Sequence, residues 1–272
     1  MIQNIEPQKL HNEFLPKTVE TDSIILCYKN DLLLCKHTGQ EITYPVYSEL
    51  NINTEHLVYA FSIDETGYFL RISQEDTSLP GYSYENVRIF RSSVPKDLVY
   101  AGMVGYHLYK WYRDTKFCGR CGSLYKPGEK ERMMSCPQCG NTVYPVISPA
   151  VIVGITNGDK LLMTKYAGRE YVNYALVAGF AEIGETIEQT VEREVMEEVG
   201  LKVKNITYYK SQPWAYSNSL LFGFFAEVDG NSDITLEETE LSEGRWFHRS
   251  EIDLEEDGVS LTREMIIKFK NG

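Results

Sequence analysis

The sequence contains no long hydrophobic run and comparatively little positive charge. No apolar stretch among its 272 residues approaches the ~20 that a membrane span requires. The first 25 residues mix charged side chains with short apolar pairs, so we expect no secretory signal and no membrane association. There are 27 Lys and Arg against 39 Asp and Glu, a net charge of −12, which argues against a general nucleic-acid coat. These features favour a cytoplasmic protein. A negatively charged ligand stays open, because bound divalent metals reverse the local sign.

Histidine clusters, internal repeats and low-complexity linkers are also missing. The five histidines are scattered without metal-ligand spacing, and we expect structural or solvated roles for them. Hydrophobic residues make up 43% of the chain, which suffices for a sizeable core. At ~100–200 residues per domain, the length suggests two domains, or one domain with an appendage.

Four of the six cysteines are concentrated in one short segment. Cys118, Cys121, Cys136 and Cys139 form the pattern Cys-x2-Cys-x14-Cys-x2-Cys, which predicts a tetrahedral zinc site rather than two disulfides. All four ligand positions are filled, so the site is expected to be structural. Glycine follows the second cysteine of each pair and allows a tight turn. The other two cysteines, Cys27 and Cys35, are expected to be buried thiols.

The cysteine segment divides the chain into three expected domains. Residues 1–115 carry short β-like runs followed by a helix over Pro95–Asp114, with Pro95 just inside its start, and predict an α+β domain. Residues 116–145 are the zinc ribbon. Residues 146–272 contain Asn157-Gly158 between two apolar runs, which predicts a β-hairpin, and strand-like runs over Tyr174–Phe180 and Leu220–Val228.

A glutamate-rich helix is expected between these two runs. Residues 186–199 contain no proline and have an apolar residue at every fourth position, and Gly200 follows as a C-cap. Glu194 and Glu198 are four residues apart and project within ~40° of each other, with Glu197 about 60° to the other side. Carboxylates crowded in this way suit Mg²⁺ or Mn²⁺. The alternative is a solvated acidic helix face.

The segment Gly179–Leu201 resembles the Nudix box, Gly-x5-Glu-x7-Arg-Glu-U-x-Glu-Glu-x-Gly-U, at every position. Its seven fixed residues, each at a background frequency of ~7%, coincide by chance on the order of 10⁻⁸ per start. The resemblance implies an α/β/α sandwich with a mixed sheet and a metal-dependent attack of water on a nucleoside diphosphate linked to a further group. It also implies that Glu194 and Glu198 bind the metal, that Glu197 is a ligand or orients the water, and that Glu185 and Arg193 hold the loop to the helix.

The zinc ribbon and a second motif resemble the NADH pyrophosphatase branch of the family. That branch carries Ser-Gln-Pro-Trp-Pro-Phe-Pro-x-Ser downstream of the box, where this chain has Ser211-Gln-Pro-Trp-Ala-Tyr-Ser-Asn-Ser219. Ala215, Tyr216 and Ser217 therefore depart from the pattern in a loop that loses two prolines. The resemblance implies a substrate-binding role for this set: Gln212, Pro213, Trp214, Ala215, Tyr216, Ser217, Asn218 and Ser219.

Further roles are implied by position in the same branch. Glu240 matches a downstream metal-binding glutamate, with Glu243 as the nearby alternative, and Ala178 would offer a backbone carbonyl to a metal. Glu131 and Tyr144 flank the second cysteine pair, where the branch contacts substrate. Thr262 stands where the branch usually has alanine. Arg88 and Lys36 are expected to reach the substrate from the N-terminal part.

The expected protein is a homodimeric NAD(H) diphosphatase that releases AMP and nicotinamide mononucleotide, with zinc as structural and Mg²⁺ or Mn²⁺ as catalytic metal. One alternative keeps the Nudix chemistry with another substrate, such as ADP-ribose, diadenosine polyphosphates or NAD-capped RNA. Another is a non-catalytic RNA-binding module, against which the complete carboxylate set argues. The sequence ranks neither the substrates nor the two catalytic metals.

Overall fold

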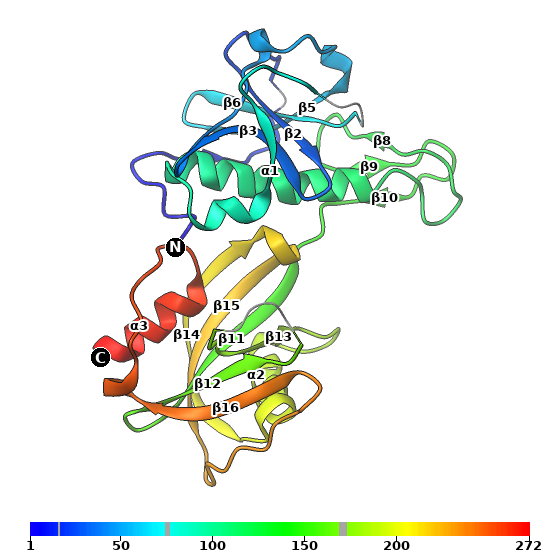
Figure 1. The fold of residues 1–272 in the computed structure, drawn as a ribbon. Helices are drawn as coiled ribbons and strands as arrows, with labels where there is room; N and C mark the ends of the chain where they lie inside the picture. The colour runs from blue at the N-terminus through cyan, green and yellow to red at the C-terminus, as the bar shows by residue number, and fades with distance from the viewer. Residues whose placement is uncertain (16, 74–76, 169–172) are drawn as a thin grey trace. The chain divides into compact units, whose positions relative to one another are not determined.

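The computed structural model describes residues 1–15, 17–73, 77–168 and 173–272 (Figure 1). The chain forms two compact units, one of residues Ile2–Val146 and one of Ile147–Gly272 together with Met1. None of the helices in these described ranges combines the length and the apolar character needed to cross a bilayer.

The N-terminal unit is built on a seven-stranded sheet with one long helix. The strand order is β1-β5-β6-β2-β3-β4, and β7 pairs with β3. The elements are β1 (Leu10–His11), β2 (Ile24–Lys29), β3 (Leu32–Thr38), β4 (Glu41–Thr43), η1 (Tyr47–Glu49), η2 (Thr54–His56), β5 (Leu57–Ile63), β6 (Thr66–Arg71), β7 (Ser83–Asn86), η3 (Val87–Arg91) and α1 (Lys96–Asp114). Pro95 is the N-cap of α1, one residue before the predicted place. Gly102 and Gly105 let α1 approach the sheet, because a Cβ there would lie 2.4 Å from the Tyr44 hydroxyl and 2.3 Å from a Leu26 methyl.

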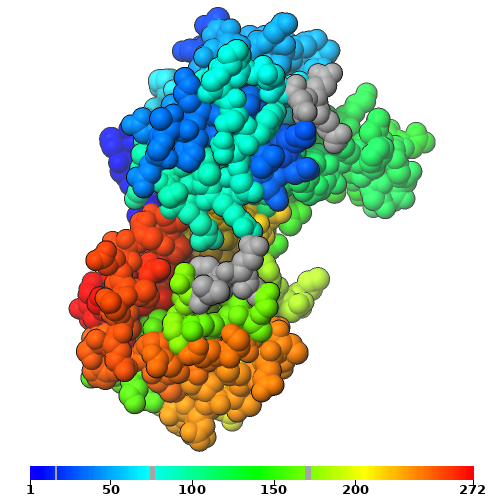
Figure 2. Space-filling model, viewed as in Figure 1, coloured from blue at the N-terminus to red at the C-terminus, as the bar shows by residue number. Residues whose placement is uncertain are grey.

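The ribbon belongs to the same unit and follows α1. It has a three-stranded sheet of β8 (Lys126–Pro127), β9 (Met134–Ser135) and β10 (Thr142–Val143). In the space-filling view its residues form a green lobe beside the blue and cyan body of the unit (Figure 2).

The C-terminal unit has a six-stranded mixed sheet with the order β14-β15-β11-β12-β16, and β13 pairs with β11. Only β11 and β15 run parallel among its described pairs. The elements are β11 (Ser148–Asn157), β12 (Lys160–Tyr166), β13 (Val177–Phe180), α2 (Ile187–Val199), β14 (Val203–Trp214), η4 (Ala215–Ser217), β15 (Ser219–Val228), β16 (Leu241–His248), η5 (Arg249–Glu251) and α3 (Leu261–Asn271).

Side-chain alternation along β11 makes this unit a three-layer sandwich. Val151, Val153 and Ile155 pack in the core that α2 covers, whereas Ile152 packs in the core that α3 covers. Successive side chains of a strand point to opposite faces, so one strand contributes to both cores. The α/β/α sandwich with a mixed sheet is therefore confirmed.

Most local predictions hold, and one is wrong. The Asn157-Gly158 hairpin is present, with Asn157 opposite Lys160 and Gly158 at φ +58°. Cys27 and Cys35 are buried, and burial raises the pKa of their thiols to about 11 and about 12. The 211–219 segment is not a loop: β14 runs through Trp214 and a single 3-10 turn leads into β15 at Ser219. Pro213 fits because β14 is an edge strand, where a missing N–H costs no ladder bond.

Candidate active site

Helix α2 carries the glutamates and is firmly defined at both ends. Thr186 caps its N-terminus in a capping box with Gln189, and Gly200 ends it in the left-handed region at φ +68°. Val191, Val195 and Val199 are completely buried against the sheet. This anchoring fixes the direction in which the polar side of the helix presents its carboxylates.

The three clustered glutamates of α2 lie in different environments. Glu194 and Glu198 are buried, with 8% and 3% of their surface exposed, whereas the Glu197 side chain is 58% exposed. A solvated acidic face would leave all three in water. Two carboxylates withdrawn from solvent therefore favour a site over that alternative.

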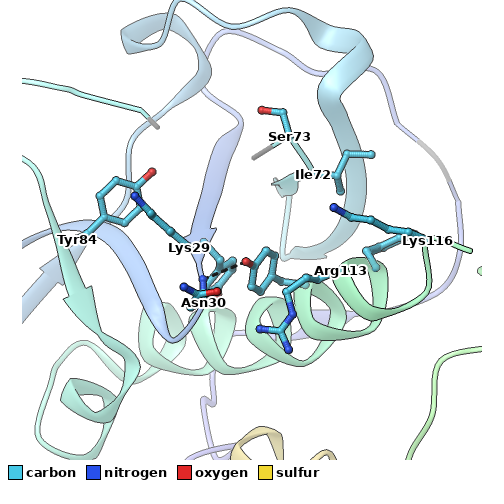
Figure 3. Close-up of a pocket in the computed structure, with 10 residues that line it drawn as sticks. Lys29, Asn30, Ile72, Ser73, Tyr84, Arg113 and Lys116 are labelled. Atoms are coloured by element: carbon cyan, nitrogen blue, oxygen red, sulfur yellow. Dashed lines mark hydrogen bonds between the residues drawn. The ribbon is translucent and has the colours of Figure 1, made fainter. Parts of the chain in front are cut away.

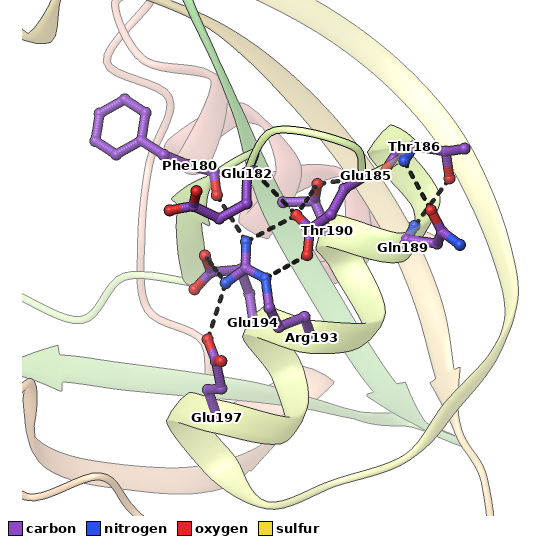
Figure 4. Close-up of polar contacts among 9 residues, drawn as sticks. All are labelled: Phe180, Glu182, Glu185, Thr186, Gln189, Thr190, Arg193, Glu194 and Glu197. Atoms are coloured by element: carbon purple, nitrogen blue, oxygen red, sulfur yellow. Dashed lines mark hydrogen bonds and ion pairs between the residues drawn. The ribbon is translucent and has the colours of Figure 1, made fainter.

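Arg193 lies at the centre of the acidic cluster (Figure 4). Its Nε and Nη2 donate to the Glu185 carboxylate at 2.6 and 3.0 Å, and Nη2 also donates to the Phe180 carbonyl at 2.8 Å. Its Nη1 donates to Glu194 at 2.7 Å and Glu197 at 2.8 Å. The five N–H groups of one guanidinium are thereby all used, and they join the loop before α2 to the helix.

The pKa values of two glutamates in the cluster, Glu185 and Glu194, are shifted in opposite directions. The Arg193 hydrogen bond and the Glu182 backbone N–H hold the pKa of Glu185 at about 2, so this carboxylate stays ionised. Burial raises the pKa of Glu194, and the neighbouring charges of Glu197 and Glu240 act in the same direction, against the opposing effect of Arg193. A bound cation would stabilise the ionised form of Glu194, because that carboxylate is buried and lies near other negative charges.

Gly179 lies directly against the Glu194 carboxylate. A Cβ on Gly179 would fall 2.0 Å from the Glu194 Cδ and 2.1 Å from both of its oxygens. Gly179 pairs with Val151 in the sheet, and its neighbour Ala178 pairs with Ile152. The first glycine of the box is thus required for space, because any side chain would displace the carboxylate.

Glu240 and Glu243 differ in what they contact. Glu243 forms an ion pair with Lys165 at 2.7 Å and accepts a hydrogen bond from Tyr174, and the Lys165 contact lowers its pKa. Glu240 is exposed and lies close enough to Glu194 to influence its pKa. The geometry therefore favours Glu240 over Glu243 as a companion of the α2 carboxylates.

The Ser211–Ser219 segment presents two aromatic rings at the end of the β14–β15 hairpin. Trp214 and Tyr216 are half-buried and meet edge to face with ring centroids 5.1 Å apart. Ala215, between them in the chain, is buried, and the Ser217 and Ser219 hydroxyls are 2.6 Å apart. Asn218 adopts φ +56°, which closes the turn.

Gln212 faces the interior of the unit. It is fully buried, its Nε2 donates to the Val259 carbonyl at 2.8 Å, and its Oε1 accepts from the Leu261 N–H at 2.7 Å. Both bonds hold the first turn of α3, where Thr262 is half-buried. In this structure Gln212 positions neighbouring backbone and presents no surface to solvent.

The remaining predicted substrate residues lie in the N-terminal unit. Tyr144 donates to Glu131 at 2.7 Å, which joins the two residues predicted to flank the second cysteine pair. Arg88 is exposed on η3, and Lys36 is exposed on β3 with its ammonium 5.7 Å from the Tyr82 ring centroid.

The four cysteines of the ribbon converge. Their Sγ atoms all lie within 4.8 Å of one another, with Cys118–Cys139 at 3.6 Å and Cys121–Cys136 at 3.5 Å. Two ligands of a tetrahedral zinc at ~2.3 Å would be separated by ~3.8 Å, so the spacing fits a structural zinc ion. The glycines after each pair adopt positive φ, as their place in the turns requires.

Phe180 is a candidate site residue that the sequence interpretation did not single out. Its ring is 50% exposed while its carbonyl binds Arg193 (Figure 4). Its place directly after Gly179, the first glycine of the box, was the signal available in the sequence.

Comparison with known proteins agrees with this geometry. Residues 147–269 match the model of the NUDIX domain, and residues 113–144 match that of the NADH pyrophosphatase zinc ribbon domain. A "NAD-capped RNA hydrolase NudC" from Salmonella paratyphi C is 40% identical over 162 residues, which cover 60% of this chain and 63% of the relative. The protein of the same name from Actinobacillus succinogenes is 37% identical over 226 residues, which cover 78% of this chain and 84% of the relative.

A crystal structure of a NUDIX hydrolase from Nitrosomonas europaea is 26% identical, with a TM-score of 0.44, covering 51% of this chain and 80% of that one. The match to the Salmonella relative spans somewhat less than two thirds of that protein's length. The match to the Actinobacillus relative is long enough, and close enough, to establish kinship over most of both chains. The chain therefore belongs to the Nudix family, and it contains a match to the NADH pyrophosphatase zinc ribbon domain ahead of its NUDIX domain.

Proposed function

We propose that the protein hydrolyses the pyrophosphate bond of NAD(H) to AMP and nicotinamide mononucleotide, and that it also acts on NAD-capped RNA. The observation that carries the proposal is the arrangement around Arg193, which holds an ionised Glu185 and binds both Glu197 and Glu194, the latter packed directly against Gly179. The relatives named NAD-capped RNA hydrolase support the substrate class.

The donor set fits a hard divalent cation, because it consists of carboxylate oxygens of which those of Glu194 and Glu198 are withdrawn from water. Glu194, Glu198 and Glu240 would hold Mg²⁺ or Mn²⁺, with the Ala178 carbonyl as a further donor. The chemistry that such a cation supplies is neutralisation of phosphoryl oxygen charge and a lower pKa of bound water.

The chain's own residues then divide the remaining work. Arg193 fixes Glu194 and one oxygen of Glu197, which leaves the other oxygen of the exposed Glu197 to orient water or accept its proton. Phe180, Trp214 and Tyr216 offer aromatic surface for a base or nicotinamide ring. Gln212 acts through the backbone that it holds at the start of α3. We also propose that the protein is cytoplasmic and forms a homodimer.

The test compares NADH, NAD⁺, ADP-ribose and an NAD-capped RNA with Mg²⁺ and with Mn²⁺, identifying products by chromatography. NADH or NAD⁺ in the lead, with nicotinamide mononucleotide released, is the expected result. ADP-ribose in the lead would keep the Nudix chemistry and overturn the dinucleotide substrate, with Ala215, Tyr216 and Ser217 as the residues to examine first.

Two glutamine variants separate catalysis from folding. Glu198→Gln is expected to lower kcat by at least about 10²-fold with zinc content and Tm preserved. The matched control is Glu192→Gln, since Glu192 is an exposed glutamate of the same helix. Normal hydrolysis by Glu198→Gln would show that the metal assignment is wrong, and no hydrolysis by the wild type would favour a binding module.

A further inference from the structure

The zinc ribbon exposes a pair of large apolar side chains that none of the roles above uses. Phe117 and Leu124 flank the first cysteine pair and are antiparallel bridge partners. Their side chains are 64% and 63% exposed. Single exposed apolar residues are ordinary, but an adjacent pair left this open on one small element marks a contact surface.

Strand alternation extends this pair into a wider face. Leu124 and Lys126 point to the same side, because Tyr125 between them points inward and is buried. The register carries the same side across the ribbon sheet, where Lys126 lies opposite Ser135 and Ser135 opposite Thr142. We call this side the outer ribbon face, and its members are Phe117, Leu124, Lys126, Ser135 and Thr142.

The ribbon differs from the rest of the chain in its charge balance. Residues 115–144 contain five Lys and Arg against two Glu, whereas the whole chain contains 27 against 39. Both glutamates, Glu129 and Glu131, lie in the turn between β8 and β9. Lys126 is exposed and forms no ion pair with any residue in the described ranges. A zinc ion with four thiolates adds two excess negative charges, so the positive charge of this face is local and lies at Lys126.

The base of the ribbon is fixed by the last turns of α1 (Figure 3). The Tyr109 hydroxyl accepts from the Asn30 N–H at 3.1 Å, and its ring stacks on the buried Tyr28 ring with centroids 5.0 Å apart. Lys116 lines the cavity beside the end of α1 (Figure 3), so alternation turns the next residue, Phe117, to the other side. A face on an ordered support loses little freedom when a ligand binds.

We propose that the outer ribbon face binds single-stranded RNA. Phe117 stacks on a base, Lys126 contacts a phosphate, and the Ser135 and Thr142 hydroxyls bond to sugar or phosphate oxygens. A ring, a cation and hydroxyl groups side by side are the chemistry that single strands require, because every base has a face for stacking and every linkage a charge. The core of an interface with a second copy would instead be depleted of charge.

The proposal deepens the proposed function, on which the role of the RNA as a substrate rests. Thr142 precedes by two residues Tyr144, which is predicted to contact substrate and whose hydroxyl donates to Glu131 at 2.7 Å. An RNA whose capped end lies at Tyr144 would continue over the outer ribbon face. Its phosphates are expected beside Lys126 and away from Glu131, which repels them.

The test measures binding of a fluorescent 12-nucleotide RNA with a 5′-hydroxyl end to the full-length protein by fluorescence anisotropy. The RNA carries no cap, so binding is read out even if the protein hydrolyses nothing. An RNA duplex of the same sequence serves as competitor. It should displace the single strand poorly, because its bases already stack on one another.

Two variants of Phe117 and one of Lys126 should weaken binding. Phe117→Ala and Phe117→Leu are each expected to cost about tenfold, because both remove the ring that stacks on a base. Phe117→Tyr keeps the ring and should bind as tightly as the wild type. Lys126→Gln should reduce the slope of log K against log salt by about 0.7, the share of one phosphate contact. Zinc content and Tm should stay unchanged, because both side chains are exposed.

The matched controls are Tyr208→Ala, which removes an aromatic ring 54% exposed on β14, and Lys96→Gln, which removes an exposed lysine at the start of α1. Equal losses in the controls, full binding by Phe117→Leu, or no binding by the wild type would overturn the proposal. A Phe117→Ala protein that binds RNA normally but sediments as a smaller species would also overturn it, because a second copy would then cover the face.

The two proposals fail separately. NADH hydrolysis should be unchanged in Phe117→Leu and Lys126→Gln, since neither residue belongs to the acidic cluster of α2. A wild type that binds the RNA through Phe117 but hydrolyses no NADH would refute the proposed function and support the RNA surface.

Discussion

Replacing Gly179 with alanine tests the placement of the Glu194 carboxylate. The new Cβ would lie 2.0 Å from the Glu194 Cδ, and ordinary contact begins near 3.4 Å, so that carbon must move by at least about 1.4 Å. Gly179 has no positive φ, so alanine is not strained there, and the displaced group is the end of a flexible side chain. The fold should therefore be preserved, whereas the position of the Glu194 carboxylate should change.

Because a misplacement of about 1 Å can cost 10²-fold in rate, we expect Gly179→Ala to lower kcat by about 10²-fold, or about 2.7 kcal/mol of transition-state stabilisation. The assay is steady-state hydrolysis of NADH, with Tm measured in parallel. The matched control is Gly119→Ala, where a Cβ would meet nothing within 4 Å. In a Glu194→Gln background the same alanine should cost little, because both changes act on one group. A kcat within a few-fold of wild type, or equal costs in both backgrounds, would refute the reasoning.

Three further predictions concern other parts of the molecule. Arg193→Lys replaces five directed donors by three on one atom, so it should lower kcat at least about tenfold and reduce the free energy of unfolding by about 1–3 kcal/mol in urea titration; unchanged values would mean that the network is dispensable. Cys121→Ser should lower zinc content below one per chain and lower Tm, and full zinc occupancy by elemental analysis would contradict the four-thiolate site. Glu185 has its pKa lowered from 4.5 to about 2, so the stability that it contributes is present above pH 4.5 and is lost as the pH falls towards 2. The urea midpoint of Glu185→Gln should therefore vary less than that of wild type over this interval, and parallel curves would count against the ion pair with Arg193.

The parts that the sequence predicts well are those decided by neighbours in the chain. The turn at Asn157-Gly158 and the capped helix before Gly200 each depend on a few adjacent residues. The cysteine pairs are similar, because the spacing alone defines two tight turns that carry the sulfurs.

The parts that escaped prediction depend on distant contacts. Strand β14 continues through Pro213 because of its place at the sheet edge, which nothing local reveals. The burial of Gln212 depends on Val259 and Leu261, 47 and 49 residues away. Helix α3 also escaped prediction, but its signals were local. Ser260 is a typical N-cap residue, and Leu261, Met265 and Phe269 recur at helical spacing.

The position of β14 at the sheet edge has a consequence for how copies of the protein meet in concentrated solution. An edge strand offers a row of amide and carbonyl groups on which a strand of another molecule can assemble. Here the register shifts between Lys204 and Thr207 and again between Tyr208 and Lys210, and Pro213 has no N–H to offer. The row of backbone amide and carbonyl groups along β14 is thereby interrupted at three points. The segment that bears Trp214 can thus remain accessible to a ligand without becoming a template for aggregation.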